Sequence, residues 1–146
     1  MDVTDSKRLT SEGARKVLAQ AIELACKEGV AVTVAVVDAG GHLLVLERME
    51  GGKFHTVHSA TTKAVCAASN KRMTGPAGAV GQSLDIAHAV GLALAAGTER
   101  WTAIEGGCPV LIDGQCVGGI GVAGGSFEFD EKVAREAVEA IGAKSA

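Results

Sequence analysis

Aromatic residues are scarce in this chain: its 146 residues include one Trp, three Phe and no Tyr. Proteins that bind single-stranded nucleic acids stack the bases on exposed aromatic rings, so that class is disfavoured. The Lys and Arg residues are scattered along the sequence, and the net charge is −3. Binding to DNA or RNA phosphates needs a clustered basic surface, and we therefore expect no nucleic-acid partner.

Long apolar segments are also missing. No stretch of about 18 uncharged apolar residues occurs, so we expect no membrane-spanning segment. Residues 1–9 are polar and charged, with no apolar run behind them, and do not resemble a secretion signal. These features predict a cytoplasmic protein.

The cysteines form no recognisable motif. The spacings of zinc sites and of covalent haem attachment are absent among Cys26, Cys66, Cys108 and Cys116. We interpret these residues as reduced and mostly buried, packing as small hydrophobic groups.

The chain does contain enough apolar material for one core. Hydrophobic residues make up 47% of the sequence and charged residues 21%, which argues against disorder. No repeat or linker divides the chain, so residues 1–146 are predicted to form a single domain, with 1–8 as a flexible N-terminus. Because aromatic rings are few, this core must be built from Val, Leu, Ile and Ala.

Hydrophobic periodicity and turn residues predict the secondary structure. Thr10 is a candidate N-cap for a helix that ends near Gly29. Dense β-branched residues at 31–37 and a return strand at 42–48 predict a hairpin. Asp113-Gly114 predicts a second hairpin, because both positions of its turn need positive φ. The remaining predicted elements are helices at 55–70, 84–96 and 127–141, a loop at 71–83, a short strand at 101–104, and strands at 109–112 and 115–122. Antiparallel hairpins flanked by helices indicate the α+β class.

One glycine pattern invites a nucleotide-binding interpretation. Gly119, Gly121 and Gly124 match the dinucleotide-binding pattern G-x-G-x-x-G. That fold needs another strand after the following helix, with an acidic residue about 20 positions on. Only residues 142–146 follow the predicted helix, so we reject NAD or FAD binding. Free backbone N–H groups near Gly124 would still suit a carboxylate or phosphate. A tight turn into a helix capped by Ser126 is the simpler interpretation.

The predicted helix at 55–70 carries the side chains best suited to ligand chemistry. At helical spacing, one face of this helix carries His55, His58, Ser59, Thr62 and Cys66. Lys63 lies on the flank of that face. His55 and His58 are spaced i, i+3, which permits a shared metal ion. Either imidazole is also a candidate axial ligand for haem or another tetrapyrrole iron. Two solvated surface histidines are the alternative.

Four charged residues are further candidates. Lys63 would either neutralise a ligand carboxylate or haem propionate, or extend its ammonium to the surface. Glu47 and Arg48 are consecutive strand residues, so only one of them can face a given pocket. Glu105 precedes two glycines that let a ligand approach the backbone closely. The predicted ligand-binding residues are His55, His58, Thr62, Lys63, Arg48 and Glu105. Lys63, His58 and Glu47 are the predicted catalytic residues.

Taken in order, several segments resemble the GlcG/HbpS family. They are residues 34–41, 46–51, 60–64, 81–84, 106–110 and 118–125, followed by Asp130-Glu131. The resemblance extends from Leu9 to Ile141, and Lys63 lies in one of the matching segments. His58 departs from the family pattern, which usually has an apolar or acidic residue there. The secretion signal of exported family members is also missing.

The resemblance implies a profilin-like, three-layer fold with a five-stranded antiparallel sheet and helices on both faces. It also implies homo-oligomers, from dimers to octamers, and links to haem, iron or corrinoid binding in catabolic operons. Three functions stay open. The first is a small-ligand-binding protein for haem, a corrinoid or another small acidic ligand. The second is a cofactor-independent lyase or isomerase acting on an aromatic or small organic acid such as a hydroxylaminobenzoate. The third is a structural oligomeric accessory protein.

Overall fold

The computed structural model of the chain describes residues 2–146. Its elements, in chain order, are α1 (Ser11–Lys27), β1 (Thr33–Asp38), β2 (Leu43–Arg48), α2 (Thr56–Asn70), α3 (Ile86–Ala96), β3 (Gly107–Ile112), β4 (Gln115–Ala123) and α4 (Phe127–Ala140). Both predicted hairpins are confirmed, and Asp113 and Gly114 have the positive φ expected of the second turn. The side chain of Thr10 caps α1 by accepting a hydrogen bond from the backbone N–H of Gly13 at 3.0 Å.

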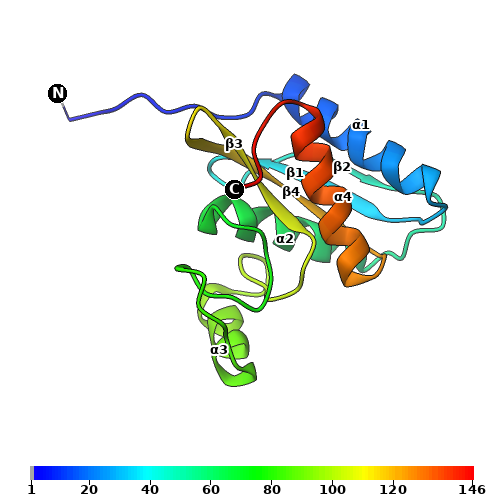
Figure 1. Cartoon of the computed structure of the whole chain (residues 1–146). Helices are drawn as coiled ribbons and strands as arrows, with labels where there is room; N and C mark the ends of the chain where they lie inside the picture. The colour runs from blue at the N-terminus through cyan, green and yellow to red at the C-terminus, as the bar shows by residue number, and fades with distance from the viewer. Residues whose placement is uncertain (1) are drawn as a thin grey trace.

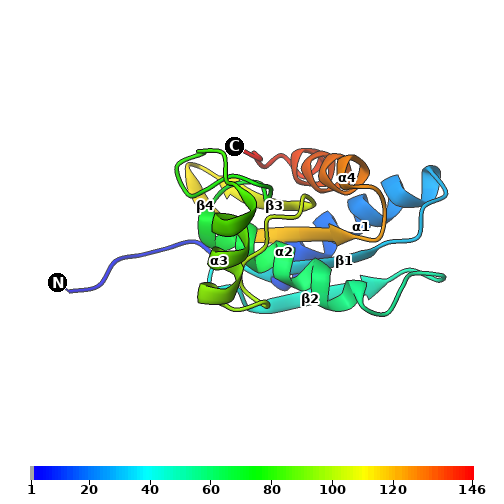
Figure 2. The ribbon, with the colours of Figure 1, turned by 90° about the horizontal axis from the view of Figure 1, so that it is seen from below.

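The strands form one antiparallel sheet in the order β2-β1-β4-β3, so β1 and β4 join the two hairpins. Figure 1 shows α1 and α4 on one face of this sheet and α2 on the other, which confirms an α+β fold with helices on both faces. Figure 2, seen from below, shows α2 crossing the sheet. Within residues 2–146, no helix is long and apolar enough to cross a membrane.

Small aliphatic side chains build the core, as the shortage of aromatics requires. The larger cluster lies between the sheet and the α1–α4 layer and includes the fully buried Val17, Val34 and Ile120. Each such side chain contributes about 1.5–3 kcal/mol when it is fully removed from water. The cluster under α2 is thinner and consists mainly of alanines together with Val37.

Glycines on the sheet explain how α2 can lie so close to it. A methyl group added at Gly121 would overlap the carbonyl oxygen of Ala60, and one at Gly119 would lie 3.1 Å from the backbone nitrogen of Ala68. Gly119 and Gly121 therefore serve helix packing. This accounts for the glycine pattern that we rejected as a nucleotide-binding motif.

Within residues 2–146 the sheet has four strands, so the expected fifth strand at 101–104 is wrong. Side chains bind the polar backbone groups of this segment. Thr74 Oγ1 donates to the carbonyl of Ile104 at 2.8 Å, and the Cys66 thiol points to the carbonyl of Thr102 at 3.7 Å. Because side chains rather than a neighbouring strand bind these backbone groups, the segment does not extend the sheet.

Between α2 and β3 the chain forms a long excursion, which we call the arm (residues 71–106). Figure 1 shows the arm leaving the layered body and carrying α3 at its far end. Its last part, residues 98–104, returns along α2. The arm thereby forms one wall of the candidate site.

At the N-terminus, residues 2–10 precede the first helix in extended form. Lys7 Nζ pairs with Asp113 at 2.9 Å, and the backbone N–H of Leu9 donates to the carbonyl of Val117 at 2.8 Å. The flexibility expected of residues 1–8 stays a prediction.

Candidate functional site

A cavity of about 490 Å³ lies between α2, the start of α4 and the arm. This volume falls within the range of about 300–1,000 Å³ that is typical of small-molecule sites. Its lining includes Trp101, Ile104 and Phe127 as large apolar groups, although aromatic residues are scarce in the chain. The polar lining residues on or next to α2 are Lys53, His55, Thr56, His58, Ser59, Thr62 and Lys63.

The α2 face predicted from helical spacing lines this cavity except for Cys66, which lies outside the lining. The ring nitrogen Nε2 of His58 lies 3.3 Å from the carbonyl oxygen of Thr98, and Thr62 Oγ1 donates to the same oxygen at 2.9 Å. Both contacts join α2 to the returning part of the arm. His55 is exposed at the N-terminus of α2, and its ring meets Phe54 edge-on. The structure therefore brings His55, His58, Thr62 and Lys63 together.

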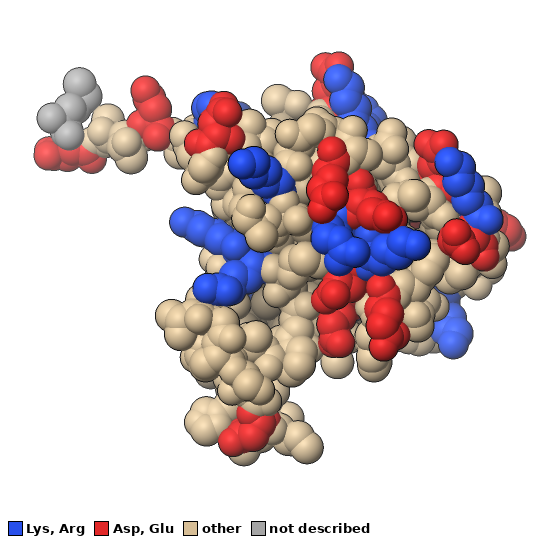
Figure 3. Space-filling view, in the orientation of Figure 1, with Lys and Arg blue, Asp and Glu red and all other residues tan. Residues whose placement is uncertain are grey.

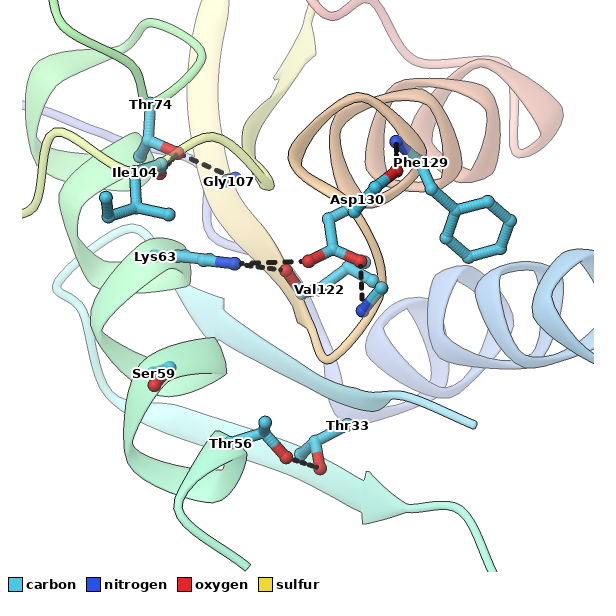
Figure 4. A network of polar contacts seen from close by, with 12 residues as sticks. Thr33, Thr56, Ser59, Lys63, Thr74, Ile104, Gly107, Val122, Phe129 and Asp130 are labelled. Carbon is cyan, nitrogen blue, oxygen red and sulfur yellow. Dashed lines mark hydrogen bonds and ion pairs between the residues drawn. The ribbon is translucent and has the colours of Figure 1, made fainter. Parts of the chain in front are cut away.

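A buried ion pair forms the floor of the site. Lys63 Nζ lies 3.4 Å from Asp130 Oδ2, and the two side chains are 5% and 2% exposed. The same ammonium donates to the carbonyl of Val122 at 2.8 Å. The other carboxylate oxygen of Asp130 accepts the backbone N–H of Gly125 at 2.9 Å. Figure 4 shows Lys63 extending from α2 toward Asp130 on α4, with Val122 between them. The sequence left two roles open for Lys63: neutralising an acidic group of a ligand, or extending its ammonium to the surface. In the structure the ammonium neither reaches the surface nor is free to bind a ligand, because it is buried and paired with Asp130.

Burial sets the protonation chemistry of this pair. It lowers the pKa of the Lys63 ammonium, and the charges of Asp130 and Glu105 only partly oppose that shift. Burial also raises the pKa of the Asp130 carboxyl group, against the opposing effects of Lys63 and of the Gly125 N–H. Both shifts favour the neutral form of each group. Perturbed pKa values of this kind cluster at functional sites.

Glycines make room for the pair. A methyl group added at Gly106 would lie 2.9 Å from Lys63 Nζ and 3.1 Å from the Cβ atom of Asp130. One added at Gly125 would lie 2.8 Å from Asp130 Oδ1. Larger residues at these positions would displace one of the charged groups.

The sequence alone indicated no role for Asp130 at the site. The residue appeared only among the segments that resemble the family. It lies 67 residues from Lys63 in the chain. The available signal was its place in the first turn of a helix predicted to start at Ser126, where acidic side chains are common. An acid in that position is usually exposed, so the pattern did not indicate burial.

Three predicted residues lie outside the cavity lining. Glu47 is paired with Val34, whose side chain is in the core on the α1–α4 face, so Glu47 points away from α2. Arg48 lies on the other face at the sheet edge, where its Nη1 donates to the carbonyl of Gly52 at 2.7 Å. Glu105 is half-buried and close enough to Lys63 to raise its pKa.

No three His, Cys, Asp or Glu side chains within residues 2–146 are grouped as a metal site would need. His42 and His88 lie outside the cavity lining and contact Asp38 and Asp85, respectively. A metal ion shared by His55 and His58 stays a prediction.

The fold and the site define a class: a layered α+β protein with a ligand-sized cavity beside the helix that covers one face of its sheet. The model of a known family, "Haem degrading protein HbpS-like", matches residues 9–139, and the chain belongs to this family.

Known relatives agree with this assignment. Protein GlcG of Escherichia coli K12 is 32% identical over 115 residues, covering 79% of this chain and 81% of GlcG. The crystal structure of Klebsiella pneumoniae protein ORFY superposes with a TM-score of 0.85 at 30% identity, covering 97% of this chain and 96% of ORFY. A structure of a PduOC:heme complex superposes with a TM-score of 0.80 at 27% identity, covering 94% and 98% of the two chains.

Proposed function

We propose that this chain is a small-ligand-binding protein whose ligand, haem in the first place, occupies the cavity between α2, α4 and the arm. The observation that carries the proposal is the combination, in one cavity, of two histidines at the N-terminal end of α2 with an apolar wall of Trp101, Ile104 and Phe127. The family membership and the similarity to a protein solved with heme support the choice of haem.

The lining residues suit the parts of a haem molecule. An imidazole from His55 or His58 would be the axial ligand to the iron. The apolar wall would contact the macrocycle and exclude water from it. Lys53 is exposed at the cavity and would pair with a propionate, whereas the Lys63 ammonium already has Asp130 as its partner. Bound iron would supply ligand-binding or redox chemistry.

A corrinoid or another small acidic ligand would use the same Lys53 ammonium and the same apolar wall, so the proposal extends to these ligands as alternatives. We place the protein in the cytoplasm and in a catabolic pathway, as the sequence analysis predicts.

Haem titration of the purified chain, followed in the Soret region, tests the proposal. We expect a saturable Soret shift that is lost or strongly weakened in either His55→Ala or His58→Ala. His42→Ala is the matched control, because that exposed histidine contacts Asp38 outside the cavity lining. An unshifted spectrum with the wild-type chain, or equal shifts in all four proteins, would refute axial ligation by α2.

A second candidate is a cofactor-independent lyase or isomerase, and the Lys63–Asp130 pair favours it. Burial shifts the pKa of each partner toward its neutral form, and such shifts are common at general acid–base sites. His58 would be the second proton carrier, because it lines the same cavity. Glu47, the other predicted catalytic residue, points away from this cavity, and we give it no part in the reaction.

Incubation with a hydroxylaminobenzoate, followed by chromatography over a range of pH, tests this candidate. We expect conversion by the wild-type chain and slower conversion by His58→Ala, with the His42→Ala control unchanged. No conversion at any pH would remove the enzyme hypothesis for this substrate. If haem binding also failed, the structural accessory role would be the remaining hypothesis.

A further inference from the structure

Helix α3 is apolar and exposed. Within residues 2–146, no other helix or strand packs against it, and none of its residues is buried. Ile86 is 83% exposed, Leu94 73% and Val90 52%. A helix that is apolar on all sides is normally buried, so this surface calls for a partner.

The outward face of α3 combines a ridge with a groove. Ile86, Val90 and Leu94 are spaced i, i+4, i+8 and form a row of large side chains. The neighbouring row, at the same spacing, consists of the small residues Ala87, Gly91 and Ala95. A methyl group added at Gly91 would meet no atom within 4 Å, so the middle of the groove is open.

The opposite side of the helix faces its own chain. The half-buried residues of α3 are three alanines, Ala89, Ala93 and Ala96, and Ala93 lines the candidate site. At helical spacing these alanines lie across the helix from Gly91. The ridge and the groove therefore face away from the body.

Charge indicates what kind of partner fits. Between Ile86 and Ala96 there is no Lys, Arg, Asp or Glu, and His88 is the one titratable residue. Figure 3 shows the lower part of the molecule, where the arm lies, as mostly uncharged surface with acidic atoms near its lower end. A charged partner would find little to pair with on this face. A surface with a ridge beside a groove of the same spacing complements itself.

We propose that α3 is a homodimer contact, in which the ridge of one copy fills the groove of another across a two-fold axis. Val90 of each copy lies against Gly91 of the other, close to that axis. Rows spaced i, i+4 interlock at a crossing angle of about −50°. This assignment gives the predicted self-association a surface, and it does not depend on haem binding.

The helix is too small to hold a dimer by itself. It is about 16 Å long, whereas a stable interface buries about 800 Å² on each partner. The contact must therefore extend along the arm, where Val80 is 78% exposed. Because Ala93, Thr98 and Trp101 of the arm line the cavity, pairing of two arms would also hold one wall of the site in place.

Gly91→Gln is the sharpest test, since it separates association from folding. Gln has a higher helix propensity than Gly, so the variant should fold at least as well as the wild type. Its side chain fills the groove and should weaken self-association by about 5- to 150-fold, the equivalent of the about 1–3 kcal/mol that overpacking costs. Circular dichroism melting checks the fold, and sedimentation velocity over a concentration series measures the assembly.

Leu94→Lys removes part of the ridge and should have the same effect on association. Val3→Lys is the matched control, because Val3 is 77% exposed and lies outside the arm. Wild-type assembly that survives in Val3→Lys and is lost in both arm variants supports the proposal. A monomeric wild-type chain at its highest soluble concentration, or arm variants that assemble like the wild type, would overturn it. Haem titration of the same variants tests the proposed function independently of self-association.

Discussion

Replacing Asp130 with Asn would leave the Lys63 ammonium buried without its carboxylate partner. The two side chains are 5% and 2% exposed and lie 3.4 Å apart, so water cannot take over the lost interaction. Removing one partner of a buried ion pair costs about 3–5 kcal/mol. Asn keeps an acceptor for the Gly125 N–H, which favours the lower end of that range.

A loss of about 3 kcal/mol is a large part of the total stability of about 5–15 kcal/mol that is usual for a domain. For a chain of this length it corresponds to a decrease in Tm of about 6–12 °C. Urea denaturation of the wild type and of Asp130→Asn measures the change. Asp113→Asn is the matched control, because Asp113 pairs with Lys7 at 2.9 Å on the surface, and its urea midpoint should stay close to that of the wild type.

The pH dependence of Asp130→Asn tests the physical cause. Burial lowers the pKa of Lys63 below its ordinary value of 10.5, and removing Asp130 removes the largest opposing effect. Between the pKa of Lys63 in the folded variant and its pKa in the unfolded chain, the unfolded chain binds more protons. Stability must therefore rise with pH in that range. The deficit relative to the wild type should therefore shrink from neutral pH toward 10.

Adding Lys63→Met to Asp130→Asn removes the unpaired charge. We expect the double variant to lose less stability than the sum of the two single variants, with a coupling of about 0.5–3 kcal/mol. Single variants that each cost under about 1 kcal/mol and add without coupling would refute the reasoning, because such values are typical of exposed pairs.

Two further predictions concern the packing of α2 and the thiols. Gly121→Ala should destabilise the chain by about 1–3 kcal/mol, because the added methyl group overlaps the carbonyl of Ala60; thermal melting beside Gly75→Ala, whose added methyl group has its nearest neighbour, Glu105, at 3.9 Å, measures it. Labelling with a thiol reagent at pH 8 should modify the exposed Cys26 rapidly and Cys108 only after unfolding, because burial raises the pKa of Cys108 to about 12. Rapid labelling of Cys108 in the folded chain would contradict the buried position.

Much of the local structure could be predicted from the sequence, because it depends on neighbouring residues. The Thr10 cap, the Asp113-Gly114 turn and the bounds of α2 and α4 follow from short-range periodicity and turn preferences. The shared face of His55, His58 and Thr62 follows from helix geometry alone. The prediction of a strand at 101–104 failed because the side chains that bind this segment come from α2 and from Thr74.

The remaining features depend on contacts between distant parts of the chain, which spacing does not encode. Only the fold brings Asp130 to Lys63 and turns Glu47 to the face away from α2. The need for glycine at positions 119 and 121 becomes clear only in the fold, because α2 packs against the face of the sheet on which a side chain at either position would lie. The apolar pattern of α3 predicted a helix, but within residues 2–146 the tertiary structure packs no other helix or strand against it. The sequence thus determined which segments are helices and strands, and packing decided which of their side chains meet.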